Sequence, residues 1–170
     1  MKKEMKEIFT NWWVRLQANN GGRAQLKRCS SPEEAALQSE THRLKNMLPG
    51  WFPLESVATI AGVSAHIKND TKLGFAQSLA TPKEKNGRVP LSESRFRQLL
   101  TCRDWDELYR TLRRSVSVLD GNVNLLSFVD TVLLWNDEFR GEYKKPGKSL
   151  KFELSRDYYG IAMKHEKQSL

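Results

Sequence analysis

The sequence predicts an all-α protein made of two packed helical bundles, with no sheet. Apolar residues recur at three- and four-residue steps through most of the chain, which is the spacing of an amphipathic helix. No segment alternates polar and apolar residues over a useful strand length. Residues that start helices (serine, aspartate, asparagine, proline) precede the apolar stretches, and glycines follow several of them.

In the N-terminal half, helices are expected over residues 6–18, 31–47, 53–66 and 71–80. The first contains Trp12 and Trp13, which we expect in the core or an interface, because base-stacking aromatics usually stand alone in a basic groove. The second starts at Ser31, which is followed by proline and two acids, as a helix N-terminus favours. We expect the whole chain, 1–170, to form one unit.

Within that unit, the sequence suggests two sub-bundles. Residues 81–90 form a polar loop with a proline near each end. This loop is the expected seam between an N-terminal bundle, 6–80, and a C-terminal bundle, 90–170.

The C-terminal half is organised around residues 86–119. Apolar positions from Trp105 to Leu119 form one stripe of a helix that faces a core. Asp104 stands at the N-cap with Glu107 three residues later, as in a capping box, and Gly121 marks the stop. Further helices are expected after Asn122 or Asn124 and over residues 150–159.

Several cations in these helices have no local acid to pair with. The chain carries 28 Lys and Arg against 20 Asp and Glu, a net charge of +8 that suggests a polyanionic partner. Arg97 can pair with Glu93, and Arg110 with Asp106 or Glu107. Among the cations without an acid three or four residues away are Lys27, Arg28, Arg95, Arg113 and Arg114. They indicate either a solvated basic face or, if they cluster in the fold, an anion-binding surface.

No pattern indicates catalysis or a metal. Cys29 and Cys102 are far apart and in no CxxC arrangement, so neither a zinc site nor a disulfide framework is expected, and a reducing cytoplasm suits them. The three histidines are isolated from one another and from cysteine. We therefore expect no enzyme and no cofactor, and no apolar run is long enough for a membrane span.

Four blocks of the sequence resemble a known family. The segments NGGRAQLKRCSSPEE, AGVSAHIKNDTKLGFAQSLA, GRVPLSESRFRQLL and DELYRTLRRSVSVL occur in the order and spacing of the small subunit of Cascade, the CasB family of type I-E CRISPR effectors. The resemblance covers roughly residues 12–135. It implies an all-helical, non-catalytic protein that packs as a pair of copies along the crRNA-bearing backbone. There it would contact the backbone and large subunits and offer a basic surface to displaced single-stranded DNA.

The resemblance also implies which residues bind nucleic acid. Lys27 with Arg28, and Arg113 with Arg114, stand where the family has basic pairs, and Arg95 opens a helix after the turn at Gly87 and Arg88. The implied nucleic-acid-binding residues are Lys27, Arg28, Arg88, Arg95, Arg113 and Arg114.

Three functions remain open from the sequence. The first is a structural subunit that stabilises the R-loop. The second is an assembly adaptor whose basic face binds acidic protein partners without DNA. The third is a small nuclease or RNA-processing enzyme, which any cleavage of nucleic acid with magnesium or manganese would reveal.

Overall fold

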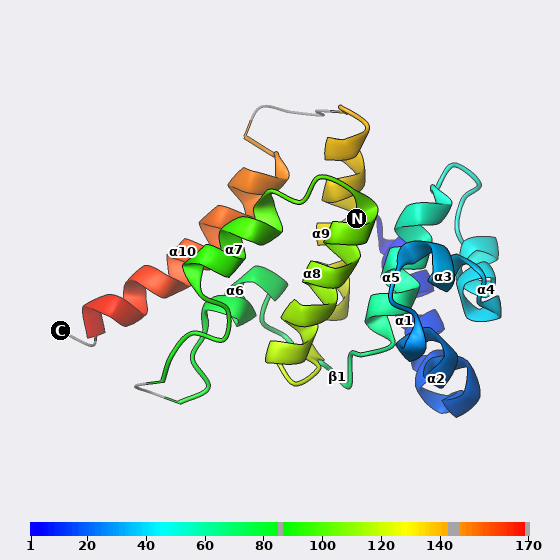
Figure 1. The fold of residues 1–170 in the computed structure, drawn as a ribbon, viewed down its shortest axis with the longest axis horizontal. Coiled ribbons are helices and arrows are strands. Elements are labelled where there is room, and N and C mark those ends of the chain that lie inside the picture. The colour runs from blue at the N-terminus through cyan, green and yellow to red at the C-terminus, as the bar shows by residue number, and fades with distance from the viewer. Residues whose placement is uncertain (85–86, 143–146, 169–170) are drawn as a thin grey trace.

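The computed structural model describes residues 1–84, 87–142 and 147–168. Over these residues the chain is helical apart from one short pair of strands, so the predicted fold class is confirmed (Figure 1). In chain order the elements are α1 (Lys3–Ala18), α2 (Asn20–Arg28), α3 (Pro32–Ala36), α4 (Ser39–Met47), α5 (Leu54–Ser64), β1 (Asn69–Asp70), α6 (Phe75–Ala80), α7 (Glu93–Leu100), α8 (Trp105–Val118), β2 (Asn122–Val123), α9 (Leu125–Phe139) and α10 (Leu150–Gln168).

Helix α5 is the centre of the molecule. Every residue from Ser56 to Ser64 is buried, and the helix packs against α2, α3, α4, α8 and α9. Figure 1 shows α5 between α1–α4 on one side and α8 and α9 on the other. Its small residues permit this close packing. A Cβ on Gly62 would lie 2.1 Å from the Tyr109 hydroxyl oxygen, so α8 can approach only because residue 62 has no side chain.

The two adjacent tryptophans of α1 lie in the core, as expected. Trp12 and Trp13 are 2% and 9% exposed, too little to offer a ring face to a base. Trp12 Nε1 donates to Glu40 O at 3.1 Å, and Trp13 Nε1 donates to Ser64 O at 3.3 Å. Each indole therefore buries its apolar surface and joins α1 to a distant segment.

The expected single helix over residues 31–47 is wrong: it is divided into α3 and α4. Ser31 caps α3 as predicted, accepting from Glu34 N at 3.2 Å. The helix then stops because Thr41 Oγ1 donates to Ala35 O at 2.6 Å, and Gln38 N bonds the same carbonyl. The turn between them lets Glu40 and Thr41 of α4 be buried.

The segment after α1 also differs from expectation. Helix α1 ends at Ala18 as predicted, but Asn20 begins a further helix, α2, that was not expected. Asn19 caps it, accepting from Gly22 N at 3.0 Å. A Cβ on Gly22 would lie 2.8 Å from Glu40 Cγ, so this glycine serves the close approach of α4.

The ends of α8 follow the prediction closely. Asp104 accepts from Glu107 N at 2.8 Å, but the Glu107 carboxylate accepts from Arg103 N instead of closing a capping box. Asp120, at φ +55°, takes the left-handed conformation that ends the helix, and Gly121 follows at φ +78° with its N–H bonded to Val116 O at 3.1 Å.

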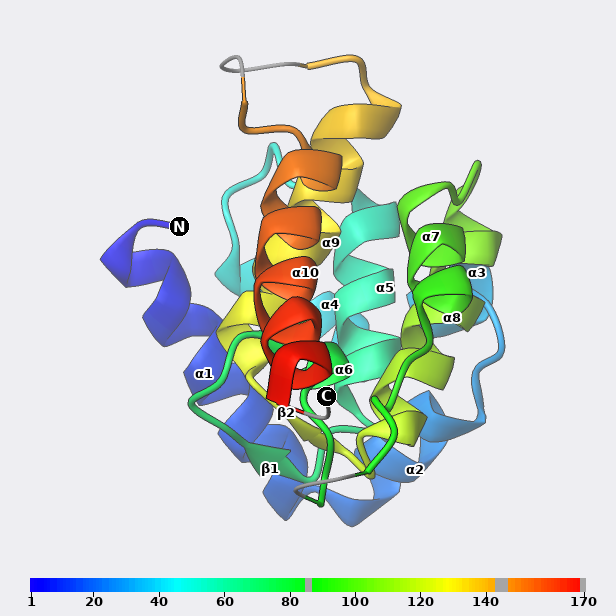
Figure 2. The same ribbon diagram turned by 90° about the vertical axis from the view of Figure 1, so that its left-hand side faces the viewer.

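Two strands of two residues each form a parallel pair that alternation could not predict. β1 pairs with β2 in the register Asn69↔Asn122, and Lys68 N donates to Gly121 O at 2.8 Å. Asn124 caps α9, accepting from Ser127 N at 2.8 Å, and its amide donates to Thr71 O at 2.5 Å. This pair links the chain after α5 to the start of α9 (Figure 2).

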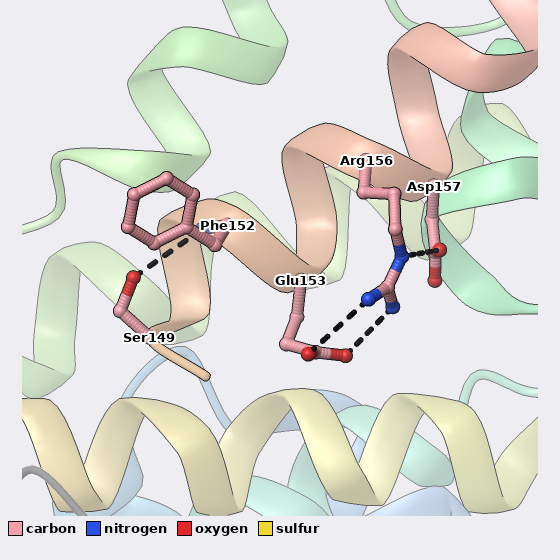
Figure 3. A network of polar contacts seen from close by, with 5 residues as sticks. All are labelled: Ser149, Phe152, Glu153, Arg156 and Asp157. Carbon is pink, nitrogen blue, oxygen red and sulfur yellow. Dashed lines mark hydrogen bonds and ion pairs between the residues drawn. The ribbon is translucent and has the colours of Figure 1, made fainter. Parts of the chain in front are cut away.

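Helix α10 is longer than predicted. It was expected to end at Tyr159 but continues through Gly160 to Gln168, because it packs along α6 and α9. Figure 3 shows its first turns, where Ser149 Oγ accepts from Phe152 N and Arg156 bonds both Glu153 and Asp157. Since α6 also packs on α10, the division into bundles 6–80 and 90–170 stays a prediction.

Candidate nucleic-acid interface

Arg113 of α8 holds the C-terminal end of α2. Its Nη1 donates to Cys29 O at 3.2 Å and its Nη2 donates to Lys27 O at 3.4 Å. The last carbonyls of a helix lack partners within the helix and carry the negative end of its dipole, so a guanidinium is well placed there. From the sequence, the Arg113 guanidinium was expected to have no partner within the protein. Arg113 is half-buried and committed to the backbone of α2, although it forms no ion pair with a described residue.

Arg23 does the same for the end of α5. Its Nε donates to Ala65 O at 3.0 Å and its Nη2 donates to Ile67 O at 3.1 Å. Arg23 stands one turn before Lys27 on α2. Helix α2 is thus joined to two neighbours by arginine–carbonyl bonds. Through Arg23 it donates to the end of α5, and its own last carbonyls accept from Arg113 of α8.

Four cations consequently meet where α2, α8 and the chain after α5 come together. We call Arg23, Lys27, Lys68 and Arg113 the basic junction. Partial burial lowers the pKa of Lys27, and the positive charges of Arg23 and Lys68 lower it further. A lysine pKa lowered by other cations means that the neighbouring field is positive.

Two acids of the surrounding segments, Glu34 and Asp120, bond to groups outside the basic junction. The Glu34 carboxylate accepts from Ser30 N at 2.6 Å and from Ser30 Oγ at 3.0 Å. Asp120 forms an ion pair with Lys83, and the Lys83 hydrogen bond is the main cause that lowers the Asp120 pKa. Lys68 contributes less to that shift. None of the four cations of the junction forms an ion pair with a described acid, although Asp120 attracts Lys68.

His66 lies inside this positive field. Arg23 donates to the carbonyls of Ala65 and Ile67, the two residues that flank His66. The Nε2 atom of His66 is buried without a hydrogen-bond partner among the described residues. Burial lowers the pKa of His66 to about 4, with Arg113, Lys27 and Arg23 as further causes. His66 is therefore neutral at physiological pH.

We expect His66 to make the fold sensitive to acid. The unfolded chain protonates this imidazole near its ordinary pKa of 6.5, whereas the folded chain does so only near 4. Between these values the unfolded state binds more protons, so stability that is present above pH 6.5 is lost as pH falls toward 4. Urea unfolding between pH 7 and pH 4.5 should show a shallower loss for His66→Gln than for the wild type. Equal slopes for the two proteins would contradict this account.

One protein-family model matches most of the chain that builds this junction. The model of CRISPR-associated protein Cse2 matches residues 22–159. The chain belongs to the Cse2 family. This is the CasB family, the small subunit of type I-E Cascade, and membership implies a structural Cascade subunit that associates with other subunits of the complex. A search of curated proteins and a search of solved structures each find no match.

The Cse2 match contains the whole basic junction and all six residues predicted to bind nucleic acid. Lys27 and Arg113 are brought together in the junction. Arg28 and Arg114, next to them on α2 and α8, are exposed and form no ion pair or side-chain hydrogen bond within the described parts of the chain. They lie free for a partner.

Arg88 and Arg95 lie apart from the junction. Arg88 is exposed in the connection between α6 and α7, and Arg95 is exposed on α7. No described contact joins either residue to α2. Arg97, by contrast, pairs with Glu93 at 2.5 Å as predicted, whereas Arg110 forms no ion pair with a described residue.

Sequence reasoning missed two members of the junction. Neither Arg23 nor Lys68 has an acid three or four residues away, so the local-pairing rule that selects Lys27 also selects both. Arg23 follows a glycine pair that indicated a helix end, and Lys68 lies outside any expected helix, so neither residue was considered.

The described residues offer no metal centre or membrane span. No group of three or more His, Cys, Asp or Glu side chains in residues 1–84, 87–142 and 147–168 is arranged to hold an ion. Cys29 and Cys102 are buried free thiols, and burial raises the pKa of each. None of the described helices is both long and apolar enough to cross a bilayer.

Proposed function

We propose that this Cse2 family member binds single-stranded nucleic acid through the basic junction and the exposed Arg28 and Arg114 beside it. The observation that carries the proposal is the meeting of four cations from three segments of the chain, none of which forms an ion pair with a described acid. Guanidinium and ammonium groups of this kind contact phosphates, which are the same in every sequence. Binding is then independent of base sequence.

In Cascade this binding stabilises the R-loop. Guide pairing reads the target, and the exchange of one duplex for another is nearly balanced in free energy. Contacts that hold the displaced DNA strand shift that balance toward the open state. In this proposal two copies lie along the crRNA-bearing backbone in the cytoplasm, contacting the backbone and large subunits. Arg88 and Arg95 face either the strand or a neighbouring subunit.

Salt dependence tests the proposal most directly. Each phosphate contact to a single strand contributes about 0.7 to the slope of log affinity against log salt, so Arg28→Ala with Arg114→Ala should lower the slope by about 1.4. Fluorescence anisotropy with an oligonucleotide of about 20 nucleotides, the length of the displaced strand, gives the measurement. Both arginines are exposed and unpartnered among the described residues, so the variant should fold normally.

The matched control removes the same charge from another place. Lys164→Ala with Lys167→Ala changes two exposed lysines near the end of α10 and should leave the slope as it is. An equal decrease in both double variants would mean that only net charge matters, which contradicts a defined surface. No retention of the strand by a protein that still joins other Cascade subunits would instead favour the assembly adaptor.

A further inference from the structure

Trp51 is the one exposed tryptophan among the five in the chain, all of which the structure describes. It is 72% exposed in the turn between α4 and α5, whereas Trp12, Trp13 and Trp135 are buried and Trp105 is half-buried. Exposing so large an apolar ring is unfavourable unless a partner covers it. The surroundings of the ring indicate what that partner is.

The turn holds the indole as a flat, supported surface. Trp51 stacks on Phe52 with ring centroids 4.3 Å apart and an angle of 23° between the planes. Phe52 is itself buried and meets Phe9 of α1 edge-on at 6.3 Å. One face of the indole therefore lies on the core, and its high exposure leaves the opposite face open to solvent.

A cation is held at the same turn. Lys45 Nζ donates to Gly50 O at 3.1 Å, one residue before Trp51, and Phe52 N donates to Pro49 O at 3.1 Å to close the turn. An exposed aromatic ring with an ammonium group at the same turn suits a single-stranded nucleotide, whose base can stack on the ring while its phosphate meets the cation. A tryptophan can also anchor a protein partner, but Lys45 and the net charge of +8 favour a polyanion.

We propose that Trp51 is a stacking site for an unpaired nucleobase, with Lys45 contacting the adjacent phosphate. This inference rests on the proposed function and adds a second point of contact to it. Trp51 precedes α5 and the basic junction follows it, so the two lie at opposite ends of a helix of 11 residues, about 16 Å long (Figure 1). A strand that runs along the molecule can reach both. Stacking accepts any base, so it keeps binding independent of sequence.

Tryptophan fluorescence and an abasic strand test the site together. An oligothymidine of about 20 nucleotides should quench the emission of the wild type and bind at least about fivefold more tightly than an abasic strand of equal length. Trp51→Ala should lose both the quenching and the preference while binding the abasic strand as the wild type does. Trp51→Phe should keep part of the preference. The matched control Leu37→Ala removes another apolar side chain, 80% exposed, and should change neither property.

The outcomes separate this inference from the proposed function. Equal, salt-dependent affinity for both strands overturns the stacking site and leaves the proposed function standing. Binding of neither strand overturns both. Quenching that persists in Trp51→Ala also contradicts the inference, as does a Trp51→Ala variant that binds DNA normally but no longer joins other Cascade subunits. That last result would assign Trp51 to a protein interface.

Discussion

Gly62→Ala is expected to destabilise the protein by about 3 kcal/mol, at the upper end of overpacking costs, because the new methyl group has no room. Its Cβ would lie 2.1 Å from the Tyr109 hydroxyl oxygen and 2.8 Å from two ring carbons. Tyr109 cannot move away easily, since it is fully buried and its hydroxyl donates to Cys29 O at 3.3 Å. Alanine would favour the helix by about 1 kcal/mol, which does not offset the clash. Thermal unfolding should show a midpoint lowered by about 6–12 °C.

A second glycine gives the matched control. Gly160 lies inside α10, and a methyl group there would meet no neighbouring side chain within 4 Å, so Gly160→Ala should raise stability by about 0.5–1 kcal/mol. Tyr109→Phe, which removes the hydroxyl, should restore part of the stability of Gly62→Ala. A Gly62→Ala protein as stable as the wild type would show that α5 and α8 are not packed this closely.

Phe96→Ala is expected to cost about 3–5 kcal/mol, the usual range for emptying the site of a buried phenylalanine. Phe96 is fully buried on α7 and stacks on Tyr158 of α10, with centroids 4.0 Å apart and planes 7° apart. Tyr159 meets the same ring edge-on at 6.0 Å. Removing the ring leaves a cavity and takes away both aromatic contacts. Urea unfolding measures the loss, and hydrogen exchange should rise first in α10.

The neighbouring position separates packing from charge. Arg95 is exposed and forms no ion pair with a described residue, so Arg95→Ala should change stability by less than about 0.5 kcal/mol. If the two substitutions had similar effects on unfolding, α7 would not be joined to α10 through Phe96. Arg95→Ala also reports whether this arginine contributes to strand binding without disturbing the fold.

Sequence signals predicted the structure correctly where the stabilising interaction joins residues only a few positions apart. Ser31, Asp104 and Asn124 cap their helices because a side-chain oxygen reaches a backbone N–H a few residues further along the chain. The stop after α8 uses two consecutive residues with positive φ, Asp120 at +55° and Gly121 at +78°, and residues other than glycine adopt this conformation at a cost. The break between α3 and α4 had no such signal, since the Thr41 hydroxyl bond to Ala35 O forms only when α4 folds back.

The candidate nucleic-acid interface was also predictable only where it depends on neighbours in the sequence. That Lys27 and Arg113 lack acids nearby in sequence is a local fact, and the fold places them together. That the guanidinium of Arg113 holds the end of α2 depends on contacts between residues 84 and 86 positions apart, which no spacing rule contains. The separation of Arg88 and Arg95 from the junction is likewise a matter of how α7 packs.

By itself the sequence determined the helical class, most helix starts and the surplus of unpaired cations, because periodicity, capping and charge act over a few residues. Only the tertiary structure decided the length of α10, the membership of the basic junction and the exposure of Trp51. Each of these depends on which distant segments bury one another's surfaces, and burial is settled by the packing of the whole chain.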